Sequence, residues 1–229
     1  MTAPLADTAG VLGVLEDVPV VPVVVIDDPA DAVPLARALA AGGLRAIEVT
    51  LRTPEAWEAI EQILGGVERM TVAAGTVTRA EEVHRLSQMG VHLAFSPGCT
   101  PRLLAAAAEA ALPLLPGVAT ASEVMLGREH GVGTFKFFPA EAMGGAQTLR
   151  IWAELFADVR FCPTGGIDAG NAAGYLELRN VVAVGGSWPA PRALIRSKAW
   201  DQIEQRAAAA VRGAARASGG DGAGAPAAM

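Results

Sequence analysis

The chain has 229 residues and a formal net charge of −6, and 52% of its residues are hydrophobic. It contains no basic run and no basic patch interleaved with aromatic residues, which argues against nucleic acid as a partner. No stretch reaches about 18 uninterrupted apolar residues, and no basic region precedes an apolar one near the N-terminus, so we expect no membrane partner, no secretory signal and, by default, a cytoplasmic protein.

Cysteine and histidine usage gives no sign of a metal centre. Cys99 and Cys162 lie far apart without the spacing of metal ligands, and His84, His92 and His130 form no cluster with them. We therefore expect no metal site and no disulfide scaffold, and both cysteines are interpreted as small buried residues.

Strands and helices are predicted to alternate along the chain after a short helix around residues 11–16. The strands are predicted at residues 18–26, 44–50, 70–75, 91–95, 112–115, 134–138, 159–162 and 180–184. The helices that follow them are predicted at residues 28–43, 53–64, 79–89, 101–111, 121–129, 147–156, 169–178 and 198–215.

Eight strands that are each followed by a helix are typical of an α/β fold of the (β/α)8 TIM-barrel type. A doubly wound open sheet also fits the alternation, but no Gly-x-Gly-x-x-Gly sequence follows the first strand. We expect a single barrel domain over residues 18–215, preceded by a segment with a short helix over residues 1–17. Residues 216–229 are small and polar and are predicted to form a disordered tail.

Lys136 lies in the middle of an apolar run that alternates like a strand, and it is one of only two lysines among the 18 basic residues. Alternation places Thr134 and Phe138 on the same face as the lysine. Phe135 and Phe137 then face outward, toward helices. An amine that is desolvated inside a barrel is favoured in its neutral form, which is a nucleophile able to form a Schiff base. The alternatives are a lysine that reaches to water at the strand end, or one half of an ion pair.

Barrels carry their chemistry at the carboxyl ends of their strands, and several predicted strands end in polar groups. These groups include Glu48, Arg52, Thr76, Ser96, Lys136 and Thr164. Glu48 is set within an apolar strand pattern, where partial desolvation suits a carboxyl group to proton transfer. The alternative is a buried ion pair with Arg52 or Lys136. Both interpretations can hold, because a lysine–carboxylate pair is also an acid/base and nucleophile couple.

Two glycine-rich segments, Gly165-Gly166 and Gly185-Gly186-Ser187, are predicted as turns after the last two strands. In barrels this position often binds phosphate, because backbone N–H groups and a helix N-terminus converge on an anion there. The alternative is that glycine only permits tight turns.

Six sequence blocks carry a resemblance to a known family. They are residues 48–53 (EVTLRT), 74–76 (AGT), 96–98 (SPG), 135–141 (FKFFPAE), 162–167 (CPTGGI) and 185–188 (GGSW). In this order and spacing they resemble the bacterial 2-keto-3-deoxy-6-phosphogluconate (KDPG) aldolases, which often also act on 4-hydroxy-2-oxoglutarate (KHG). The resemblance implies a class I aldolase on a (β/α)8 barrel, usually a homotrimer, that takes a phosphorylated keto acid and needs neither a metal nor another cofactor.

The resemblance also implies a role for each matching residue. Lys136 is expected to form the Schiff base and Glu48 to be the general acid/base. The residues expected to line the keto-acid end are Arg52, Thr76, Pro97, Phe138 and Thr164. The residues expected to hold the phosphate are Gly165, Gly166, Gly186 and Ser187.

The sequence departs from the family pattern after Trp188 and at Val25-Ile26, where some relatives carry an arginine, and both departures concern substrate preference. Within the class, a galactonate-derived epimer and unphosphorylated KHG are alternative substrates. Outside it, the alternatives are a non-covalent phosphosugar-binding barrel with isomerase or synthase activity, in which Lys136 acts only electrostatically, and a phosphosugar-binding protein without catalysis.

Overall fold

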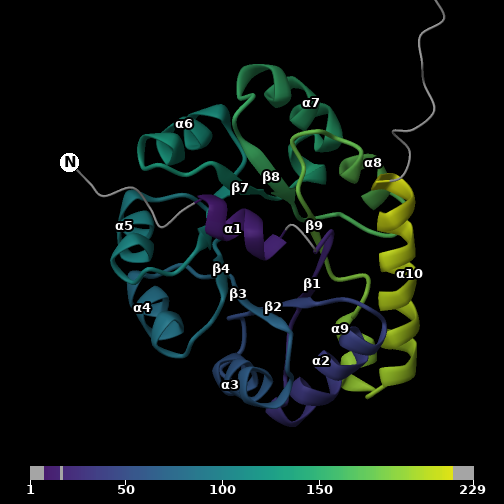
Figure 1. Ribbon diagram of the computed structural model, residues 1–229. Helices are drawn as coiled ribbons and strands as arrows, with labels where there is room; N and C mark the ends of the chain where they lie inside the picture. The colour runs from purple at the N-terminus through teal and green to yellow at the C-terminus, as the bar shows by residue number, and fades with distance from the viewer. Residues whose placement is uncertain (1–7, 16–17, 219–229) are drawn as a thin grey trace, which may run out of the picture.

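The computed structural model describes residues 8–15 and 18–218, and its helices surround a central group of strands (Figure 1). The strands are β1 (Val20–Val24), β2 (Ala46–Thr50), β3 (Thr71–Gly75), β4 (Leu93–Phe95), β5 (Leu114–Leu115), β6 (Gly117–Val118), β7 (Thr134–Phe137), β8 (Arg160–Pro163) and β9 (Val184–Gly186). The α-helices are α1 (Thr8–Leu15), α2 (Ala32–Ala41), α3 (Ala56–Gly66), α4 (Ala80–Gln88), α5 (Pro101–Glu109), α6 (Ala121–Glu129), α7 (Gly145–Leu155), α8 (Ala172–Leu176), α9 (Arg192–Arg196) and α10 (Trp200–Ser218). Two 3-10 helices are η1 (Pro29–Asp31) and η2 (Glu141–Met143).

The strands are hydrogen-bonded in two parts, and every pairing between them is parallel. Six strands follow the order β5-β4-β3-β2-β1-β9, and three follow the order β6-β7-β8. Pro116 alone separates β5 from β6 along the chain, and single bridges join Phe161 to Val181 and Thr164 to Gly185. This curled parallel sheet confirms the predicted α/β class, whereas a complete ring of eight strands stays a prediction.

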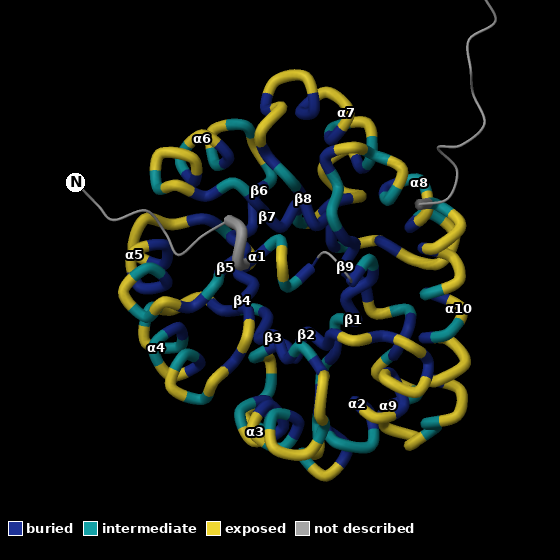
Figure 2. The backbone as a smooth tube through the Cα atoms, viewed as in Figure 1, coloured by how far each residue is buried: buried dark blue, intermediate teal, exposed yellow. Residues whose placement is uncertain are grey.

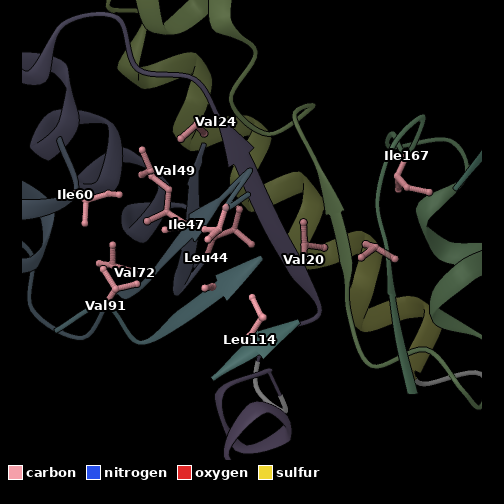
Figure 3. Close-up of a cluster of buried hydrophobic side chains, with 14 of the residues drawn as sticks. Val20, Val24, Leu44, Ile47, Val49, Ile60, Val72, Val91, Leu114 and Ile167 are labelled. Carbon is pink, nitrogen blue, oxygen red and sulfur yellow. The ribbon is translucent and has the colours of Figure 1, made fainter. Parts of the chain in front are cut away.

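The strands are buried on both faces, which explains why valine, alanine and leucine dominate them. One apolar cluster lies between strands and outer helices, where Ile47, Val49 and Val72 approach Ile60 of α3 (Figure 3). A second cluster joins α1 to the inward side chains of the strands. Its buried members are Val11, Leu15, Val18, Val21, Ala46, Ala73, Leu93, Phe95, Leu115, Cys162 and Ala183. Exposed positions gather on the outward sides of the helices (Figure 2).

The last strand differs from its prediction. β9 is Val184–Gly186 rather than residues 180–184, and Gly185 and Gly186 pair with Val21 and Pro22 of β1. The prediction that Gly185 and Gly186 form a turn is therefore wrong, because both belong to the sheet. The apolar pattern ends at Val184, and glycine carries no side chain from which the pattern could continue.

The ends of the described chain are helical. α1 spans Thr8–Leu15, and α10 extends to Ser218, so residues 216–218 continue the last helix instead of starting the predicted tail. The disorder predicted for residues 219–229, and the remainder of the segment 1–17, lie outside the described residues. The domain boundaries stay predictions.

Candidate active site

Lys136 points to the inner side of the sheet, as the alternation in its strand predicts. The rings of Phe135 and Phe137 face the other way, and they pack against Phe161 and Trp152 with centroid distances of 6.3 and 5.2 Å. Both phenylalanines are fully buried in the outer cluster. This outer packing fixes the rotation of β7 and thereby aims the lysine, which is only 5% exposed, at the inner side.

Glu48 of β2 is the ion-pair partner of this lysine. Lys136 Nζ donates to Glu48 Oε1 at 2.8 Å and to Oε2 at 3.1 Å. The two residues are 88 positions apart in the chain, and both side chains are almost completely buried. A buried ion pair contributes little stability in return for its desolvation cost, so this pair is better explained by chemistry than by folding. The short contact also allows a proton to pass directly between the amine and the carboxylate.

A glycine makes room for the Glu48 carboxylate. A Cβ atom on Gly75 of β3 would lie 2.1 Å from Glu48 Oε1 and 2.7 Å from its carboxyl carbon, which is far inside van der Waals contact. A glycine inside a strand weakens it and often marks a close approach of another group. We interpret Gly75 as the residue that lets the carboxylate lie against β3 within reach of Lys136. This role was not predicted from the sequence, although a glycine inside an apolar strand is a signal for it.

We expect Gly75→Ala to lower kcat by on the order of 10²-fold, because the methyl group displaces the carboxylate from the amine. The fold should survive, since the overlap is with a side chain rather than with backbone. Steady-state kinetics with thermal melting would check this. Gly65→Ala is the matched control, because a Cβ atom at Gly65 meets nothing within 4 Å. Equal kcat values for the two variants would contradict the interpretation.

Two aromatic rings lie near the lysine nitrogen. Lys136 Nζ is 5.0 Å from the ring centroid of Phe95 and 5.7 Å from that of Phe138. Phe138 was predicted at the site, whereas Phe95, the last residue of β4, was not. Its inward direction follows from the alternation of β4, in which Leu93 and Phe95 share the inner cluster. Nothing in the sequence shows that this ring reaches the lysine of β7.

Arg52 and Thr76 form a second polar group at the carboxyl ends of β2 and β3. Arg52 Nε donates to Thr76 Oγ1 at 3.2 Å, so the alternative in which Arg52 pairs with Glu48 is not the arrangement found. Thr76 has a φ of 60°, in the left-handed region that few non-glycine residues adopt. Such strain is typical of functional sites. The exposed guanidinium remains able to bind a carboxylate.

The polar residues after β4 and β8 lie at the same ends of the strands. Ser96 directly follows β4 and donates its hydroxyl to Gly98 O at 2.7 Å, and the next residue, Pro97, is exposed. Thr164 directly follows β8, is 6% exposed and forms the bridge to Gly185. A Cβ atom at Gly185 would lie 2.4 Å from Thr164 Oγ1. This glycine therefore accommodates Thr164 rather than forming a turn.

Gly165 and Gly166 form a left-handed turn with φ values of 99° and 78°, a conformation that favours glycine. Their carbonyl groups accept from Glu141 N at 3.1 Å and from Asn171 Nδ2 at 2.9 Å. Within the part of the chain that the structure describes, the N–H groups of these two glycines and of Ser187 donate to no acceptor. The Ser187 side chain is exposed. The two interpretations of these glycines, a tight turn and a phosphate-binding site, are thus compatible.

The segment after Ser187 is attached to the end of β1. Arg192 Nε and Arg196 Nε of α9 donate to Asp27 Oδ2 at 2.9 and 2.7 Å. These hydrogen bonds lower the pKa of the Asp27 carboxyl well below its usual range. The exposure of both arginines limits their contribution to stability. The cluster holds the chain that carries Ser187 near the same ends of the strands.

Residues 8–15 and 18–218 contain no group of three or more His, Cys, Asp or Glu side chains that could hold a metal ion. No helix in these residues is long and apolar enough to cross a membrane.

Comparison with known proteins identifies close relatives. A family model described as KDPG and KHG aldolase matches residues 11–206. A KHG/KDPG aldolase from Escherichia coli (strain K12) is 47% identical over 196 residues, covering 86% of this chain and 92% of the relative. A 2-dehydro-3-deoxy-phosphogluconate aldolase from Dickeya dadantii (strain 3937) is 49% identical with the same coverage. The crystal structure of a KDPG aldolase from Legionella pneumophila, with pyruvate captured at low pH as a covalent carbinolamine intermediate, has a TM-score of 0.84 and 44% identity, covering 86% of this chain and 96% of that one.

Proposed function

The chain belongs to the KDPG and KHG aldolase family, and we propose on this basis that it is a Schiff-base aldolase that cleaves KDPG to pyruvate and glyceraldehyde 3-phosphate. The observation that carries the proposal is the buried pair of Lys136 and Glu48, with 2.8 Å between Nζ and Oε1. Cleavage of the C3–C4 bond of a 2-keto acid needs an electron sink at C2, and a protonated imine on a lysine supplies it.

Lys136 and Glu48 divide the chemistry between them. Proton transfer from Lys136 to Glu48 gives a neutral amine that attacks the C2 carbonyl, and the carbinolamine that forms then loses water. The protonated Glu48 donates to the departing hydroxyl group, which leaves a cationic imine and restores the carboxylate. The carboxylate next accepts the proton of the C4 hydroxyl as the C3–C4 bond breaks and its electrons enter the imine.

The remaining residues bind the two ends of the substrate. Arg52, Thr76, Pro97, Phe138 and Thr164 line the keto-acid end. The exposed guanidinium of Arg52 supports this assignment, because it is a suitable donor to a carboxylate. Gly165, Gly166, Gly186 and Ser187 hold the phosphate. The N–H groups of Gly165, Gly166 and Ser187, which donate to no acceptor in the described residues, support that part.

KHG is a second substrate of the same site. It shares the 2-keto acid that reacts with Lys136, but it has no phosphate for the residues of the phosphate site to bind. Recognition of KHG therefore depends on the keto-acid end.

Ser187→Ala is expected to raise KM for KDPG by roughly 10- to 100-fold through the loss of one hydrogen bond to a charged group, worth about 1.5–3 kcal/mol. The value of kcat should change little, since Ser187 lies outside the Lys136 and Glu48 pair. KHG, which has no phosphate, is the internal control. An equal loss of kcat/KM with both substrates would contradict the phosphate assignment.

The proposed function is tested by measuring the pyruvate released from KDPG with a coupled lactate dehydrogenase assay. Equimolar pyruvate and glyceraldehyde 3-phosphate are expected. Binding of KDPG without release of pyruvate would favour the non-covalent phosphosugar-binding barrel and would overturn the aldolase assignment.

The two parts of the sheet close into one (β/α)8 barrel in this proposal. The bridges of the β8 segment to Val181 and Gly185 support closure on one side, and the single-residue separation of β5 from β6 supports it on the other. The inner apolar cluster, capped by Val11 and Leu15 of α1, is what a closed barrel would enclose.

The protein assembles as a homotrimer. Large apolar side chains on neighbouring helices support self-association, because Met125 of α6 and Ile151 and Leu155 of α7 are 55%, 55% and 63% exposed. Light scattering should give three times the chain mass of 23.4 kDa. A monomer at assay concentrations would contradict the trimer.

A further inference from the structure

Phe95 presents an aromatic ring to the nitrogen on which the reaction takes place. Lys136 Nζ lies 5.0 Å from the centroid of this ring, inside the distance of about 6 Å at which a cation is attracted to a π face. The side chain of Phe95 is 1% exposed and belongs to the inner cluster, so its ring is shielded from water. Desolvation of this kind strengthens the attraction.

The charge on Nζ changes during imine formation. The paired ammonium is cationic, the amine that attacks the carbonyl is neutral, and the carbinolamine is neutral as well. Loss of water breaks the C–O bond with a proton from Glu48, and the nitrogen lone pair forms the C=N bond, so the positive charge returns to Nζ. A ring beside this atom therefore favours the imine over the carbinolamine.

We propose that Phe95 is a further catalytic residue, which stabilises the cationic imine on Lys136 relative to the neutral carbinolamine. This inference rests on the proposed Schiff-base function. Phe138 contributes less, because its ring is 5.7 Å from the nitrogen and is only partly buried. The Glu48 carboxylate of β2 balances the positive charge of the imine. The Phe95 ring of β4 stabilises the same charge without being charged itself, so the carboxylate stays free to transfer protons.

The test is the rate at which borohydride reduces the enzyme in saturating pyruvate, followed by the mass of the intact protein. Borohydride reduces the imine but not the carbinolamine, so the rate reports the partition between them. Phe95→Leu is expected to lower this rate by about 30-fold, the equivalent of about 2 kcal/mol at about 1.4 kcal/mol per factor of ten. Replacement of Phe95 by pentafluorophenylalanine, which keeps the size of the ring but removes its negative face, is expected to give a comparable loss.

Phe156→Leu is the matched control, because its ring belongs to the outer cluster at the end of α7 and not to a strand beside Lys136. Borohydride should reduce this variant at the wild-type rate if the protein is folded. A wild-type rate for the pentafluorophenylalanine enzyme would overturn the role of Phe95 while leaving the aldolase intact. Absence of any adduct in the wild-type protein would instead overturn the Schiff-base function and this inference with it.

Discussion

Lys136→Arg is expected to abolish KDPG cleavage while the protein remains folded, with a loss in kcat on the order of 10⁴- to 10⁶-fold, the scale associated with removal of a catalytic nucleophile. The guanidinium keeps its positive charge beside Glu48, which limits the cost of leaving a buried carboxylate unpaired. It cannot release a proton to become a neutral amine, so no imine forms. Steady-state assays and thermal melting measure the two effects separately.

The other lysine of the chain provides the control. Lys198 is 59% exposed and pairs with Asp31 at 3.2 Å, away from the reacting pair. Lys198→Arg should therefore keep the wild-type kcat. If Lys136→Arg retained turnover within about tenfold of the wild type, Lys136 would be acting through charge alone, as in the non-covalent isomerase or synthase alternative.

Glu48→Gln is expected to lower kcat by about 10²- to 10⁴-fold, the usual contribution of a general acid/base. The amide has nearly the shape of the carboxyl group and can still accept a hydrogen bond from Lys136, so KM should change much less than kcat. Rapid-quench experiments should show slow imine formation on an intact Lys136. We expect both the dehydration of the carbinolamine and the C3–C4 cleavage to slow, because the proposed mechanism uses the Glu48 carboxyl group in both steps.

A carboxylate remote from the site provides the control, because its replacement shows whether loss of a negative charge by itself lowers kcat. Glu109 is exposed beside His84, and Glu109→Gln should leave kcat unchanged. A wild-type kcat for Glu48→Gln would remove Glu48 as the acid/base and leave it as a structural partner of the lysine.

Local pattern was sufficient to predict the α/β class and the inward direction of Lys136. The phenylalanines on either side of Lys136 are buried among other aromatic rings, and this outer packing enforces the inward direction expected from period two. The sequence allows two ion-pair partners for Glu48, namely Lys136 and Arg52. Which of these contacts forms depends on the relative positions of β2 and β7, which local alternation does not determine.

The residues missed by sequence analysis act across strands. Phe95 reaches the lysine from β4, and Gly75 matters because the side chain of β2 needs its space. The wrong bounds predicted for β9 have a related cause, since the register of Gly185 and Gly186 against β1 is set by backbone pairing and not by an apolar pattern. Contacts of this kind depend on register and curvature, which a single sequence specifies only through the whole fold.

The most direct test of the Schiff-base mechanism is to incubate the protein with pyruvate and borohydride and to map the modified peptide by mass spectrometry. We expect one reduced pyruvate adduct, located on Lys136, and none on Lys198. A folded protein without an adduct, or with its adduct on a residue other than Lys136, would contradict the mechanism.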